Sequence, residues 1–190
     1  MMYEVAQYVG TKRKVRISRH TPCEPLLNGF LLDSSASLVL MHAFHDFMPD
    51  GYTIFRLEDV EGMRSGPYER HWEDMLLAEG LLKSLDFSEK IDLSSMRSAI
   101  ESISDRFERL IVECEDDDED VQDFYIGSLV SADFDCITFR HFDGYGYWEA
   151  EPAKIDIGDI TKVQFDTPYV NIFSKYLRSG SRPASLGDDD

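Results

Sequence analysis

Short runs of aliphatic, β-branched and aromatic residues recur along the chain and are separated by turn-prone residues. Runs of this length and composition are typical of β-strands. They predict strands in the first half of the chain over residues 15–17, 29–33, 37–42, 52–57 and 60–63, and in the second half over residues 110–112, 124–131, 136–141, 153–157 and 160–165. Each half thus has about five short strands, the number that a small, strongly bent antiparallel barrel needs.

Three other segments carry apolar residues at helical spacing. The first follows Pro67, and the last follows Thr167 and Pro168. Threonine is a good N-cap, and proline suits the first helical position, where its missing amide costs nothing. Between these two, residues 94–108 show the pattern of an amphipathic helix. We therefore expect a helix after each set of strands and a helical linker between the sets.

The two sets of strands also resemble each other. A shift of 98 positions places Gly29 on Gly127 and keeps the apolar positions around them in order. A slightly longer shift places Tyr68 on Tyr169. Few residues are identical, but the ordered set of matches favours an internal duplication. We predict that the two halves superpose, with each of these pairs in equivalent positions.

The second half contains a glycine two residues before an apolar residue, an aspartate after the strand, and then another apolar strand. These are Gly127, Leu129, Asp133 and residues 137–139. Together they resemble the first motif of the Sm-like small β-barrel proteins. The first half has the same pattern, except that Ser35 stands in the place of the aspartate. The resemblance implies a small-barrel topology in each half.

The residues with which Sm-like proteins bind RNA are missing from both halves. That family uses an asparagine shortly after the aspartate, and Val39 and Ile137 stand in its place here. The arginine–glycine pair of the family's fourth-strand turn is missing as well. The resemblance therefore supports a topology and not RNA binding, and a fold analogy would not establish a function in any case.

These patterns together predict an α+β protein. We expect two tandem small antiparallel β-barrels or strongly bent sheets, each followed by a helix and joined by a helical linker. The expected boundaries are a first repeat over residues 1–83, a linker over 84–108, a second repeat over 109–178 and a disordered tail over 179–190.

The charge of the chain restricts its partners. Among 190 residues there are 37 acidic and 19 basic ones, a net charge of −18 at pH 7. Such an excess repels phosphate backbones and anionic lipids, so we expect neither nucleic acid nor a membrane as partner. The sequence shows no signal peptide, and its three cysteines lack metal-binding spacing. We therefore expect a cytoplasmic protein without a cofactor.

Acidic and basic residues are unevenly distributed. Residues 113–123 contain eight acids in eleven positions, whereas residues 12–19 form a basic cluster. Solvated loop and edge-strand charges are the plainer interpretation of both segments. The alternative is a bipolar surface that self-associates, basic end to acidic end. The acidic run does not match an EF-hand loop, because Val121 stands where that loop needs glycine. Weak divalent-cation binding is the open alternative for this run.

One cluster of residues has the chemistry of an active site. His42, His45, Asp46 and Asp50 fall within nine positions and include types that bind metals or transfer protons. Because this segment has the pattern of a strand that leads into a turn, polar residues at a solvent-facing strand end are the plainer interpretation. A metal-dependent hydrolase-type enzyme that uses His42, His45 and Asp46 is the alternative hypothesis, and an RNA-binding Sm-like protein is a less favoured one.

The leading hypothesis is a non-enzymatic protein-interaction module, an accessory or immunity-type protein, whose second half makes the main contact. Aromatic anchors and clustered acids carry this hypothesis, at Tyr145, Tyr147, Trp148, Asp116, Asp117, Asp118 and Asp120. Clustered acids speed the encounter with a basic partner, and aromatic residues are enriched among the residues that dominate binding energy. The expected partner is therefore a protein with a basic surface, or a second copy of this chain.

Overall fold

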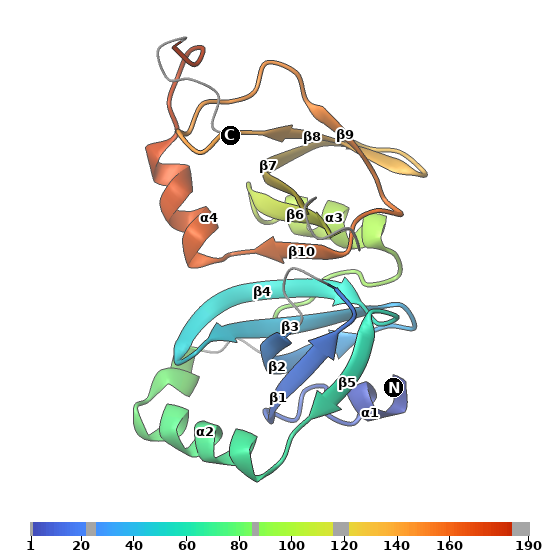
Figure 1. The fold of residues 1–190 in the computed structure, drawn as a ribbon, viewed down its shortest axis with the longest axis vertical. Helices are drawn as coiled ribbons and strands as arrows, with labels where there is room; N and C mark the ends of the chain where they lie inside the picture. Colours follow the sequence, from blue (N-terminus) through green and yellow to red (C-terminus); the bar gives the residue numbers. More distant parts are fainter. Residues whose placement is uncertain (1, 22–25, 85–87, 116–121, 184–190) are drawn as a thin grey trace.

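The computed structural model describes residues 2–21, 26–84, 88–115 and 122–183 (Figure 1). Strands form at the expected places because turn residues separate the β-forming runs. The strands of the first half are β1 (Lys14–Arg19), β2 (Leu26–Ser34), β3 (Leu38–His45), β4 (Met48–Arg56) and β5 (Val60–Arg64). Those of the second half are β6 (Leu110–Glu115), β7 (Gln122–Ala132), β8 (Cys136–His141), β9 (Ala153–Asp156) and β10 (Lys162–Phe165).

These ten strands form one open antiparallel sheet in the order β5-β1-β2-β3-β4-β10-β6-β7-β8-β9. The prediction of two tandem small barrels or strongly bent sheets, each followed by a helix, is therefore wrong. The outer edge of β4 pairs with β10 of the second half, where Phe55 lies opposite Lys162 and Tyr52 opposite Phe165. An edge strand offers backbone donors and acceptors to any suitable strand, and a hydrophobic pattern does not specify which strand pairs with it.

The helices are short. They are α1 (Met2–Ala6), α2 (Pro67–Ala78), α3 (Met96–Ser104) and α4 (Pro168–Phe173), with 3₁₀ turns at η1 (Leu81–Ser84) and η2 (Ser174–Tyr176). The predicted cap of the last helix is confirmed, because the Thr167 hydroxyl accepts the Val170 amide at 3.0 Å. The linker helix is shorter than expected, since the Arg106 and Phe107 amides both bond back to the Ile103 carbonyl. The pattern did not predict α1.

The two halves share their strand order and the details of one hairpin. The β2–β3 register shifts between Leu31 and Asp33, and the β7–β8 register shifts between Leu129 and Ser131, which are 98 positions further along. The same backbone hydrogen bond closes both hairpins, from Ser35 to Leu38 and from Asp133 to Cys136. The correspondence of the halves therefore extends to backbone pairing.

Gly29 and Gly127 occupy matching places in β2 and β7, and both are closely approached by the neighbouring strand. A Cβ atom on Gly29 would lie 2.1 Å from the His42 carbonyl oxygen, and one on Gly127 would lie 1.9 Å from that of Arg140. No side chain fits at such distances, so the backbone approach itself requires glycine at both positions.

The core explains why the first four residues of β3, 38–41, are all apolar. Val39 and Met41 belong to a buried cluster within the first half, whereas Leu38 and Leu40 belong to a cluster that includes α3 and the second half. Successive side chains of a strand point to opposite faces, so a strand covered on both sides needs a continuous apolar run. The shared cluster therefore packs the two halves against each other.

A buried ion pair also joins the halves. The side chains of Arg19 in β1 and Glu115 in β6 have no exposed surface, and Nη2 lies 2.5 Å from Oε2. The Thr161 hydroxyl donates to the same Glu115 oxygen at 2.8 Å, and Asp59 lies 3.9 Å from Arg19. Burial opposes ionisation of Glu115, but the hydrogen bond and charge of Arg19 prevail and hold the pKa of Glu115 below its ordinary value.

Arg56 of β4 provides a second connection between the halves. Its Nε donates to the Ile160 carbonyl at 2.8 Å, and its Nη2 donates to the carbonyls of Ile157 at 2.7 Å and Gly158 at 3.1 Å. These carbonyls lie in the turn between β9 and β10. The guanidinium therefore holds the segment that brings β10 alongside β4.

Candidate functional site

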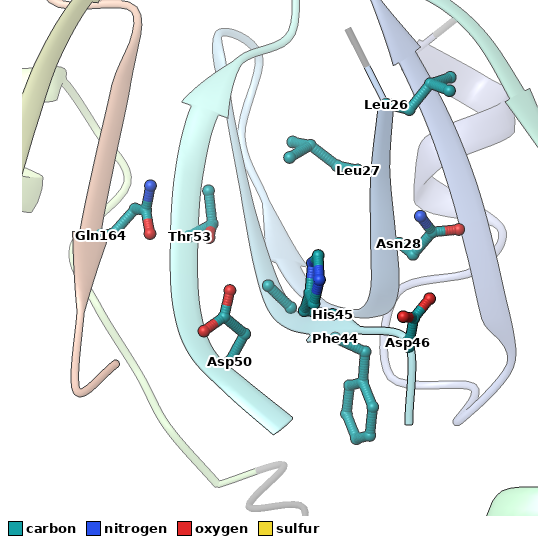
Figure 2. Close-up of a pocket in the computed structure, with 10 residues that line it drawn as sticks. Leu26, Leu27, Asn28, Phe44, His45, Asp46, Asp50, Thr53 and Gln164 are labelled. Atoms are coloured by element: carbon teal, nitrogen blue, oxygen red, sulfur yellow. The ribbon is translucent and has the colours of Figure 1, made fainter. Parts of the chain in front are cut away.

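A polar pocket lies where strands of the first half meet β10, and we call it the histidine pocket. Its cavity volume is about 260 Å³. Figure 2 shows its lining, which includes Asn28 of β2, His45 of β3, Asp46, Asp50 of β4 and Gln164 of β10. The structure therefore brings three of the four candidate catalytic residues to one cavity.

His42, the fourth candidate, does not line that pocket. Its side chain packs among rings, with centroid distances of 4.7 Å to Tyr52 and 5.7 Å to Phe44. Within the described part of the chain, no group of three or more His, Cys, Asp or Glu side chains is placed to hold a metal ion. The structure therefore separates His42 from His45 and Asp46, and the metal-dependent hydrolase stays a prediction.

The aromatic candidates lie in the loop between β8 and β9, residues 142–152, which we call the aromatic loop. The Asp143 carboxylate accepts the amides of Tyr145 at 3.0 Å and Tyr147 at 2.8 Å. The Gly146 amide donates to the Asp143 carbonyl at 2.9 Å, and Gly146 has a φ of +85°, a conformation that favours glycine. Backbone hydrogen bonds to one aspartate therefore fix the loop.

The segment after α4 packs against this loop. The Arg178 amide donates to the Gly146 carbonyl at 2.8 Å, and the Arg178 guanidinium lies 5.4 Å from the centre of the Tyr147 ring. Arg182 lies 3.5 Å from the Asp143 carboxylate and 4.9 Å from the centre of the Tyr145 ring. Residues 179–183 of the expected disordered tail are thus described, and Arg182 among them contacts the loop; residues 184–190 lie outside the described residues.

Trp148 has arginines against its ring. The Arg140 guanidinium lies 4.6 Å from the ring centre and that of Arg109 lies 6.0 Å from it. The Phe142 ring meets the indole edge-on, with centroids 5.3 Å apart. Cations over an aromatic face are attracted by its negative potential. The indole is therefore held in place by a ring and two charges.

Three arginines line one cavity beside Trp148, and we call it the arginine pocket. Its volume is about 620 Å³, and its lining includes Arg109, Arg140, Arg178, Trp148 and the acid Glu149. Arginine is thus locally in excess, although the whole chain carries a net charge of −18. The arginines are far apart in the sequence, which is why residue patterns did not reveal them. Tyr147 borders the pocket through its contact with Arg178.

Comparisons of the chain with protein-family models, with curated proteins and with solved structures find no match. No helix in the described part of the chain is long and apolar enough to cross a membrane. The chemistry of the site must therefore be inferred from its own residues.

The acidic and basic segments are not simply solvated surface. Glu113 is buried with its carboxylate 3.1 Å from the Lys162 ammonium, and burial raises its pKa above the ordinary value in spite of that cation. Arg19 of the basic cluster is buried as well. The interpretation of both segments as solvated charge is therefore wrong for these residues. The site candidates Asp116, Asp117, Asp118 and Asp120 lie outside the described residues.

Proposed function

We propose that the protein is a non-enzymatic protein-interaction module that makes its main contact through the arginine pocket and the aromatic loop. The observation that carries this proposal is the set of guanidinium–ring contacts of Arg140 with Trp148 and of Arg178 with Tyr147, at 4.6 and 5.4 Å. Tryptophan, tyrosine and arginine are the residues most enriched among those that dominate binding energy at interfaces. An accessory or immunity-type role and a cytoplasmic location stay predictions.

The fixed shape of the loop supports the same proposal. Association costs free energy whenever flexible side chains and loops must be ordered, and a preformed surface avoids part of that cost. Here Asp143 holds the backbone of the loop, while Arg140 and Phe142 hold the Trp148 ring. The loop therefore presents its aromatic residues in one arrangement before any partner binds.

The loop is also a place where the two halves differ. We infer that the halves arose by internal duplication, on the basis of their shared strand order and register. β4 has nine residues, but β9, its counterpart in the second half, has only four. Residues 148–152 of the aromatic loop occupy the positions that correspond to the beginning of β4. Divergence at this position supports a separate role for the aromatic loop. The resemblance to Sm-like proteins stays a prediction.

Photo-crosslinking in the source cell tests the proposed surface. A benzoylphenylalanine placed at Ala150, which lines the arginine pocket, should capture a discrete partner. Trp148→Ala should abolish that product, because it removes the ring on which the contact depends. Phe134→Ala is the matched control, since Phe134 is 92% exposed on another loop of the same half, and it should leave the product intact. A product that Trp148→Ala does not change, or no product at all, would contradict the proposal.

A further inference from the structure

The arginine pocket indicates the chemistry of the partner as well as the place of contact. We propose that it binds an acidic peptide segment of the partner protein, in which aspartate or glutamate side chains flank an apolar residue. This inference rests on the proposed function. The basic partner expected from residues 113–123 would contact another part of the surface and stays a prediction.

Arg140 and Arg178 retain donors for a ligand. Arg109 is less available, because its Nη2 donates to Glu108 at 2.7 Å and its Nε is buried. Arg140 and Arg178 have aromatic rings beneath them, at 4.6 and 5.4 Å. The N–H donors of a guanidinium lie in its own plane, so a group stacked on a ring can still bind a carboxylate through two parallel hydrogen bonds.

The other lining residues indicate which side chain of the peptide lies beside its carboxylates. Trp148, Ala150 and Leu177 give the cavity an apolar part beside the arginines. A cavity of about 620 Å³ lies within the range of ligand sites and holds a few side chains rather than a folded domain. An apolar side chain next to one or two acids therefore fits both parts of the lining.

The net charge of the chain favours a short peptide over a nucleic acid. Every phosphate of a bound strand beyond the pocket would approach a protein with a net charge of −18, without the basic track that such binding uses. A short acidic segment places only its own few carboxylates near the arginines. Arg109 is paired with Glu108, which leaves Arg140 and Arg178 against the single acid Glu149 of the lining for that small number of carboxylates.

Salt dependence follows from the same charges and has an unusual sign. At 0.01 M salt the screening length is about 30 Å, so the net negative charge of the whole chain repels an acidic peptide. At 0.15 M salt it is about 8 Å, so the attraction of the nearby arginines dominates the electrostatic interaction. An acidic peptide should therefore associate faster at 0.15 M than at 0.01 M salt. A basic peptide attracted to the net negative charge should do the opposite.

Selection from a displayed library of random twelve-residue peptides tests the proposal without a known partner. The library is selected on the wild-type chain, on a double variant with Arg140→Gln and Arg178→Gln, on Trp148→Ala, and on Arg97→Gln. Arg97 lies on α3, outside the pocket lining, and serves as the matched control. Thermal unfolding of each variant verifies that it is folded.

The wild-type and control chains should enrich peptides that combine Asp or Glu with an apolar residue. The double arginine variant should bind these peptides at least about tenfold more weakly, since each lost charge-assisted hydrogen bond is worth roughly one decade of affinity. Peptides that depend on Trp148 but are not acidic would overturn this inference and leave the proposed function standing. An absence of any Trp148-dependent peptide would overturn both. If a twelve-nucleotide DNA displaces the bound peptides at a lower concentration than free peptide does, the pocket binds nucleic acid instead of an acidic peptide.

Discussion

Replacing Arg19 with methionine removes one partner of the ion pair that joins the two halves. Both side chains of the pair have no exposed surface, so Glu115 would be left as a buried charge beside the Thr161 hydroxyl. Loss of one partner from a buried pair costs about 3–5 kcal/mol. In a chain of this length that corresponds to a fall in melting temperature of about 6–20 °C.

The size of this loss should depend on pH. In the wild type Arg19 holds the pKa of Glu115 below its ordinary value, so the stability from this group is present above the unfolded-state pKa and is lost as pH falls through the folded-state value. In the variant, burial without the arginine raises the pKa of Glu115, so stability is lost as pH rises. The difference in free energy of unfolding between the two proteins should therefore grow from about pH 3 toward about pH 7, because the ordinary pKa of glutamate lies within this range.

Urea unfolding followed by tryptophan fluorescence measures both effects. The double variant Arg19→Met with Glu115→Leu is the essential comparison, because it removes the fully buried Glu115 charge together with its partner and should recover most of the lost stability. Asp59 loses only a cation 3.9 Å away, and its side chain is partly exposed. A cost of less than about 1 kcal/mol for Arg19→Met, the level of an exposed pair, would contradict a stabilising role for this ion pair. A double variant as unstable as the sum of the single ones would contradict it as well.

Three further changes test other parts of the structure. Gly29→Ala and Gly127→Ala should each lower the free energy of unfolding by about 2 kcal/mol or more, because the new Cβ would overlap a carbonyl oxygen, whereas Gly144→Ala, which has open space around it, should be nearly neutral. Thr167→Ala should cost about 1 kcal/mol through loss of the α4 cap, measured by urea unfolding against Thr167→Ser, which keeps the hydroxyl. Burial raises the pKa of the Cys114 thiol to about 12, so mass spectrometry should find it unlabelled by iodoacetamide at pH 8 in the folded protein and labelled in urea.

The positions of the strands and caps were predictable because their causes are local. Turn residues bound each β-forming run, and Thr167 caps α4 through the amide of Val170, three residues away. The pairing of β4 with β10 was not predictable in this way. It depends on which of several similar edges meet in space, and the residues that hold it, such as Arg19 and Glu115, are 96 positions apart.

The candidate site was predictable only in part, for the same reason. Trp148 stood out because several aromatic residues and glycines are adjacent in the sequence. The arginines that surround it come from β8, from the segment before β6 and from the segment after α4. No local pattern brings Arg109, Arg140 and Arg178 together. The structure therefore places beside Trp148 a set of arginines that the sequence pattern did not reveal.

The β4–β10 strand pair lies within a single polypeptide. If the two half-sheets were separate chains, their pairing would follow mass action, and dilution would separate them. A covalent connection makes the pairing intramolecular, with an effective concentration of the order of millimolar for a short tether. The melting temperature should therefore not depend on protein concentration. The histidine pocket, which needs Gln164 of the second half in its lining, should therefore be complete in every folded molecule, at any cellular abundance.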